Sequence, residues 1–162
     1  MSTASWTGVK HLIRTRLLTF TPATGTTLLV RLGSTSSGSG ASGKLFFDQA
    51  PDNLTGLWAV LRVIDAPMAG MDGRLMMRGT AELFLYGRPR KMQAQVESMA
   101  DVCMEAWRDF VYNEIGGHFS ATDVTRGGAI PYTEPADREL VAIRLLLEFR
   151  CAPMFLLQYA AT

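Results

Sequence analysis

A length of 162 residues is enough for one domain with a single buried core. Hydrophobic residues make up 48% of the chain and charged residues only 19%, which is typical of a globular protein that places little charge on its surface. The formal net charge of +1 excludes a strong overall field that would draw the chain onto nucleic acid or an anionic membrane.

The first predicted element is an amphipathic helix over residues 5–20. Its apolar residues recur at spacings of three and four, namely Val9, Leu12, Ile13, Leu17 and Phe20. Residues 26–32 are ambiguous between a short helix and a strand, and we favour a helical turn or two closed by Gly33. Residues 33–43 consist only of Gly, Ser, Thr and Ala. We expect a flexible loop there, either a tolerated surface loop or one that becomes ordered against a neighbouring subunit.

A series of strands is predicted next. A short strand over residues 44–47 leads into a turn over residues 48–53. The apolar run 57–64 is typical of a central strand covered on both faces. A hairpin connection over 66–73 follows, with Asp72-Gly73 as its turn pair. Residues 74–86 then alternate between two faces, and the polar face carries Arg78, Thr80 and Glu82 together with Met76, Phe84 and Tyr86.

The longest helix is predicted after the break at Gly87-Arg88-Pro89-Arg90. One apolar face is traced by Met92, Val96, Met99, Cys103, Ala106 or Trp107, and Phe110. We expect Gly116-Gly117 to end this helix and the helix itself to be the main layer packed on the sheet.

Two strands complete the predicted fold. The first is a short strand over 118–125, and the second is a closing strand whose odd positions from Val141 to Cys151 are all apolar. Its even positions include Arg144, Glu148 and Arg150. Residues 154–159 are too apolar to lie free in water, so we expect them to pair with the sheet or to dock on another subunit. The fold class is therefore α+β: a mostly antiparallel sheet of about four to five strands, packed against one long and one N-terminal helix, in a single domain over 1–162.

Localisation and redox state are predicted from the ends of the chain and its cysteines. The N-terminus lacks a basic region followed by an apolar stretch, and no apolar run is long enough to span a bilayer. We therefore expect synthesis in the cytoplasm and no membrane partner. Cys103 and Cys151 fall within apolar patterns, which favours two reduced thiols in the core.

No catalytic motif is found in the sequence. The two histidines and two cysteines have neither the spacing of a metal site nor that of a nucleophile and its base. Residues 38–44 resemble a phosphate-binding loop in composition, but Leu45 replaces the required hydroxyl. We therefore expect no enzyme activity and no catalytic, cofactor-binding or metal-binding residues. A small α+β enzyme and a monomeric ligand-binding module remain the alternatives outside this interpretation.

An acidic row recurs every four residues along the long helix, at Glu97, Asp101, Glu105 and Asp109. Like charges at this spacing repel one another by a few tenths of a kcal/mol per pair. One interpretation is a solvated helix face. The other is that the acidic row meets basic residues of a neighbouring subunit, either Arg88 and Arg90 or the first helix.

The order of elements resembles the tail-terminator proteins of long-tailed bacteriophages, which are also called tail completion proteins. The local marks are the Phe47-Asp48-Gln49-Ala50-Pro51 turn before the 57–64 strand and the Leu83–Arg88 strand end before the long helix. The likeness covers residues 9–150. Residues 33–43 and 153–162 form a longer loop and a longer extension than this family leads us to expect.

The resemblance implies a sheet backed by helices and an assembly of the chain with itself, as a hexameric ring. The ring would cap the tail tube, stop its polymerisation and present a surface to the head side. The implied partners are further copies of the chain, the major tail tube protein and a head-side connector or stopper protein, with DNA only as passing cargo. The implied place is the tail or neck of the virion. Another head–tail joining, neck or minor tail protein is the alternative within this class.

Candidate contact residues follow from this interpretation. We expect the subunit or tube interface to include Arg88, Arg90, Glu97, Asp101, Glu105, Phe155, Leu156 and Tyr159.

Overall fold

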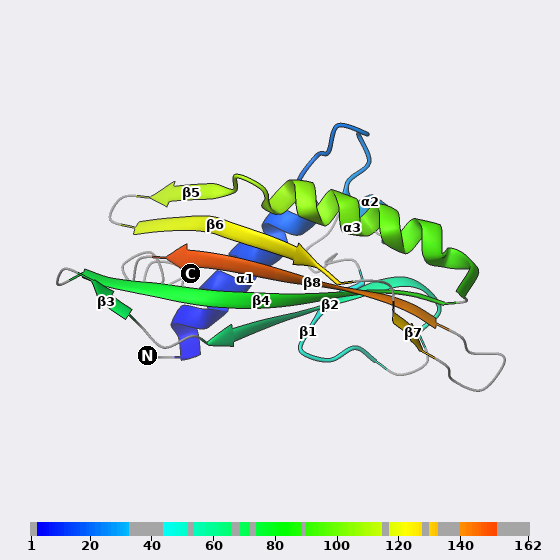
Figure 1. Ribbon diagram of the computed structural model, residues 1–162, viewed down its shortest axis with the longest axis horizontal. Helices are drawn as coiled ribbons and strands as arrows, with labels where there is room; N and C mark the ends of the chain where they lie inside the picture. Colours follow the sequence, from blue (N-terminus) through cyan, green and yellow to red (C-terminus); the bar gives the residue numbers. More distant parts are fainter. Residues whose placement is uncertain are drawn as a thin grey trace.

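The computed structural model describes residues 3–32, 44–51, 54–65, 69–71, 74–88, 90–114, 117–127, 130–132 and 140–151. In chain order the elements are α1 (Thr3–Thr19), α2 (Leu28–Arg31), β1 (Leu45–Phe47), β2 (Gly56–Asp65), β3 (Ala69–Met71), β4 (Arg74–Arg88), η1 (Arg90–Met92), α3 (Gln93–Trp107), β5 (Val111–Glu114), β6 (Gly117–Arg126), β7 (Ile130–Tyr132) and β8 (Leu140–Cys151). The α+β class is confirmed (Figure 1).

The sheet contains more strands than the four to five that we predicted. Eight strands are found in the described parts of the chain, with the main order β1-β2-β4-β8-β6-β5, while β3 pairs with β4 and β7 with β8. The β1–β2 pair is parallel and the other described pairs are antiparallel, so the sheet is mostly antiparallel as expected. The extra strands β3, β5 and β7 are only three or four residues long. A strand this short contains too few residues for an alternation of apolar and polar positions to be recognised in the sequence.

One hydrophobic core lies between the sheet and the helices. The core-facing positions of β4 and β8 are odd-numbered, and they pack with one face of α1 and one face of α3. This cluster contains Val9, Ile13 and Leu17 from α1, Val96, Met99 and Cys103 from α3, and Leu83, Leu85, Leu145 and Leu147 from the sheet. In Figure 1, α1 crosses behind the strands and α3 runs beside them. The predicted packing of both helices on one sheet is confirmed.

The end of α3 differs from the prediction. The helix ends at Trp107, and the chain forms β5 before it reaches Gly117, so Gly116-Gly117 does not terminate it. The chain turns where Asp109 adopts a left-handed conformation with φ 59° and where Phe110 N donates to Trp107 O at 3.1 Å. Asp tolerates this conformation better than most residues do, because its short polar side chain can hydrogen-bond locally.

The long strand after the Phe47–Pro51 turn is covered less completely than we predicted. In β2, Trp58 and Val60 are buried on the side away from the core cluster, but Arg62 on the same side is exposed and Ile64 is 41% exposed. This strand is therefore covered on both sides only along its first half. Predictions that fall on Gly33, the 33–43 loop, Asp72-Gly73 and residues 154–159 lie outside the described residues.

Candidate interaction surface

The sheet has a second face, opposite the helices, which we call the open face. It is formed by the even-numbered side chains of β2, β4 and β8, because successive side chains of a strand point to opposite sides. Its described members are Trp58, Val60, Arg62, Ile64, Arg78, Thr80, Glu82, Phe84, Tyr86, Arg88, Ala142, Arg144, Leu146, Glu148 and Arg150. No described helix packs on this face, where Trp58, Val60 and Ala142 are buried and the exposed members are Arg62, Ile64, Arg78, Glu148 and Arg150.

Three aromatic rings form a ladder at one end of the open face. Trp58 and Tyr86 are cross-strand neighbours that stack with ring centroids 5.2 Å apart, and Phe84 stacks on Tyr86 at 6.2 Å. Two guanidinium groups lie over these rings: Arg88 is 5.8 Å from the Trp58 centroid and Arg144 is 6.0 Å from that of Phe84. The ladder borders a hollow of about 350 Å³ that the Asp48–Ala50 turn also lines. Trp, Tyr and Arg are the residues that most often dominate protein–protein binding energy.

A carboxylate anchors the middle of the open face. Arg144 Nε donates to Glu82 Oε2 at 3.1 Å, and only 13% of the Glu82 side chain is exposed. Arg62 lies opposite Glu82 in the β2–β4 register. Glu82 is therefore placed between two arginines of neighbouring strands, and its charge offsets part of theirs. This arrangement fixes the orientation of Arg144 over Phe84.

The far end of the open face carries a second hollow, of about 290 Å³. Its charged lining residues are Arg78, Glu148 and Arg150, and its hydroxyl-bearing ones are Thr80 and Thr122. Arg78 and Arg150 are direct cross-strand partners in the β4–β8 register. The two hollows differ in chemistry, since the first is aromatic and the second is charged.

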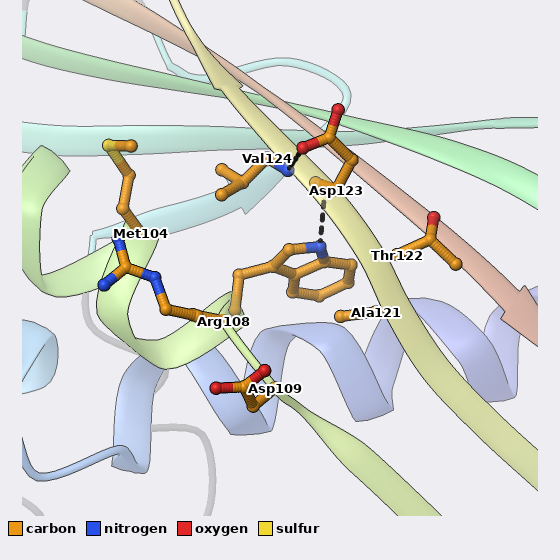
Figure 2. A pocket seen from close by; sticks show the side chains of 8 residues that line it. Met104, Arg108, Asp109, Ala121, Thr122, Asp123 and Val124 are labelled. Atoms are coloured by element: carbon orange, nitrogen blue, oxygen red, sulfur yellow. Dashed lines mark hydrogen bonds between the residues drawn. The ribbon is translucent and has the colours of Figure 1, made fainter.

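A third hollow lies on the helix side of the sheet, around Trp107 (Figure 2). The indole Nε1–H donates to two backbone carbonyls, Asp123 O at 3.1 Å and Glu148 O at 3.2 Å. Asp123 and Glu148 are register partners that border an irregularity in the β6–β8 pairing between Ala121 and Asp123. A bulge disturbs the ladder locally, and the indole N–H gives both carbonyls a donor at this point. Trp107 also packs against Phe110, Phe119 and Phe149, so we assign it to packing rather than to ligand binding.

Both cysteine thiols are buried. Burial raises the pKa of the Cys151 thiol to about 12 and raises the pKa of Cys103 as well, so neither is poised as a thiolate nucleophile. Within the described ranges, no group of three or more His, Cys, Asp or Glu side chains could hold a metal ion. The described helices include none that is both long and apolar enough to cross a membrane.

Solved structures of other proteins align with this chain. A chain in the solved structure of the virion of a native gene transfer agent particle aligns with 93% of this chain and 99% of its own length, at 12% sequence identity and a TM-score of 0.52. The two chains share a fold. A second solved structure aligns over 65% of this chain and 78% of its own, at 17% identity and a TM-score of 0.42. No model of a known protein family and no curated protein matches the sequence.

The predicted interface residues occupy separate places. Arg88 lies over Trp58 on the open face, and Arg90 begins η1 just before α3. The acidic row lies on α3 and already makes contacts within the chain: Glu97 accepts from Gln93 Nε2 at 3.2 Å, Asp101 pairs with Arg126 at 2.9 Å, and Glu105 accepts from Ala23 N at 3.3 Å. Phe155, Leu156 and Tyr159 lie outside the described residues.

Sequence reasoning did not identify the aromatic ladder or the arginine pair as site features. The alternation in residues 74–86 placed Arg78, Phe84 and Tyr86 on one side of a strand. It could not show that Trp58 of β2 lies beside Tyr86, or that Arg150 of β8 lies beside Arg78, because those neighbours depend on strand order and register.

Proposed function

We propose that this chain is a structural protein of a phage-type virion, of the tail-terminator kind. Copies of it form a hexameric ring that caps the tail tube, ends tube polymerisation and joins the tube to the head-side connector or stopper protein. DNA passes through the ring only as cargo. The observation that carries this proposal is the fold shared with a virion chain over nearly the full length of both proteins.

Two local features support the proposal. The Phe47–Pro51 segment, one of the marks of the resemblance, forms a tight turn in which Asp48 has φ 62° and Gln49 N donates to Phe47 O at 2.6 Å. Asp48 N also donates to Leu61 O at 3.0 Å, which ties the turn to β2. The second feature is the open face, where aromatic rings and arginines provide the composition of a protein-binding surface.

The proposed action is steric. One face of a closed ring has the same kind of binding surface as the end of the tube. The other face presents different chemistry, so no further tube subunit can add. Each boundary between ring subunits should bury on the order of 1,200–2,000 Å². We place the contacts of the ring or tube at Arg88, Arg90, Glu97, Asp101, Glu105, Phe155, Leu156 and Tyr159.

The test is assembly of the purified chain, alone and with the tube protein of the same particle. Sedimentation velocity measures the size of the assembly, and negative-stain electron microscopy shows its shape. We expect rings, either in free solution or on tube ends, and tubes that stop growing when the chain is added.

The contrary results are equally specific. A chain that stays monomeric at micromolar concentration and also leaves tube growth unchanged contradicts the proposal and favours a ligand-binding module or an enzyme. A ring that binds the head-side connector but does not affect the tube favours another head–tail joining protein.

A further inference from the structure

Two like charges face each other on the open face. Arg78 and Arg150 are direct cross-strand partners, and both side chains are exposed. Like charges placed directly opposite in a sheet are destabilising. Neither guanidinium makes an ion pair or a hydrogen bond with another described residue. Among the described residues, the pair is therefore a local repulsion that an anion between the two arginines would relieve.

The surroundings of this pair fit an anion of single charge. The hollow of about 290 Å³ also contains Glu148 and the hydroxyl-bearing Thr80 and Thr122. Two guanidinium charges and one carboxylate leave a net charge of +1, which matches a carboxylate better than a dianionic phosphate. A planar carboxylate also accepts paired hydrogen bonds from guanidinium groups.

The opposite side of the subunit offers such carboxylates. The α3 sequence contains Glu97, Asp101 and Glu105 and no Lys, Arg or His. Asp101 is already paired with Arg126, which lies 2.9 Å away. Glu97 and Glu105 have uncharged donors, the Gln93 side-chain amide and the Ala23 backbone N–H. These two carboxylates repel Asp101 at the four-residue spacing and have no described cation of their own.

We propose that the Arg78–Arg150 hollow receives the carboxylate of Glu97 or Glu105 from α3 of a neighbouring copy of this chain. The inference rests on the proposed ring, and it names the partner of the acidic row as the Arg78–Arg150 end of the open face rather than Arg88, Arg90 or the first helix. The open face and α3 lie on opposite sides of one sheet. The contact therefore joins two different surfaces, and such head-to-tail contacts produce a ring when the rotation closes.

Charge reversal on each side tests the pairing. One variant carries Arg78→Glu and Arg150→Glu, and the other carries Glu97→Arg and Glu105→Arg. Each variant alone should need at least about tenfold more protein for half-assembly, as measured by sedimentation velocity, because like charges then meet at every boundary. A one-to-one mixture of the two variants should assemble near the wild-type concentration, since every boundary then joins opposite charges.

A matched control keeps the charge. The variant with Arg78→Lys and Arg150→Lys should assemble within about threefold of the wild type, because both positive charges remain. Circular dichroism melting checks that each variant is folded, and the reversed variants should melt within a few degrees of the wild type because the altered side chains are on the surface.

The outcomes separate this inference from the proposed function. Wild-type rings together with unaffected charge-reversed variants overturn the inference and leave the ring intact. Reversed variants that fail to assemble both separately and as a mixture overturn the pairing of these two surfaces. A wild-type chain that forms no ring alone or on the tube overturns the proposed function, and this inference with it.

Discussion

Arg16 shows how one polar side chain can join two layers of the fold. It lies on α1, and its Nε donates to Ala106 O at 2.8 Å, one of the last carbonyls of α3. Its guanidinium also lies over two rings, 4.6 Å from the centroid of Phe20 and 4.7 Å from that of Phe110. The helix end gains both a hydrogen bond and a positive charge, each of which stabilises a helix C-terminus.

Replacing Arg16 with Met should lower the free energy of unfolding by about 1–3 kcal/mol, because the apolar stem remains while the hydrogen bond and the ring contacts are lost. Replacing Arg16 with Lys should not preserve this stability, since an ammonium group cannot reproduce a planar group between two rings. Urea denaturation measures the change. Arg126→Ala is the matched control: it removes an exposed ion pair with Asp101 and should cost less than about 1 kcal/mol. Equal losses of unfolding free energy in the Arg16→Met and Arg126→Ala variants would contradict this role for Arg16.

The two thiols lead to a pH prediction at the same scale. Burial raises the pKa of Cys151 from 9.0 to about 12, and it raises the pKa of Cys103 too. Above pH 9 the unfolded chain releases thiol protons that the folded chain still holds, so stability should fall as the pH rises from 9 toward 12. Cys151→Ala should make this fall shallower, as measured by urea denaturation at several pH values. An unchanged slope would show that Cys151 ionises equally in the folded and unfolded chain.

At the scale of the element, sequence periodicity predicted the long segments well. The run of apolar odd positions from Val141 to Cys151 lies in β8, and the apolar face from Met92 to Trp107 lies in η1 and α3. Both patterns repeat enough times to distinguish a helix from a strand. The predicted end of α3 was wrong, because two adjacent glycines indicated a helix end more strongly in the sequence than Asp109 did.

The candidate site was less predictable than the fold. Arg78, Phe84 and Tyr86 were assigned to one strand face, but their neighbours Arg150 and Trp58 belong to strands distant in the sequence. Only the register of β2, β4 and β8 brings them together. The bulge between Ala121 and Asp123 was equally unpredictable, since it depends on how β6 pairs with β8.

This bulge gives a prediction for Trp107. Replacing Trp107 with Phe keeps an aromatic ring among Phe110, Phe119 and Phe149 but removes the donor to Asp123 O and Glu148 O. Two partly buried carbonyls would lose this donor, and we expect a loss of about 1–3 kcal/mol in unfolding free energy. Faster amide hydrogen exchange should appear in β6 near the bulge. A variant as stable as the wild type, with unchanged exchange, would show that the bulge does not need the indole N–H.

At the scale of the whole molecule, the two sides of the sheet have different chemistry. One side is closed by α1 and α3 over a single core, and the other presents aromatic rings and arginines with no described helix above them. A subunit built this way has two unlike surfaces available for contact. Copies joined through unlike surfaces form rings or filaments rather than two-fold dimers, which agrees with a proposed role at the end of a tube.

The segment 154–162 provides the last prediction. Every core residue that the structure describes lies at or before Cys151, so a chain ending at residue 153 should fold and melt within a few degrees of the full chain. Removing Phe155, Leu156 and Tyr159 takes away proposed contacts, and the concentration for half-assembly should rise at least about tenfold, which corresponds to about 1.4 kcal/mol. Melting by circular dichroism and sedimentation velocity measure the two effects. A variant with Ser at these three positions should reproduce the loss if the side chains are responsible. Rings that form at an unchanged concentration would show that this segment is not part of the subunit interface.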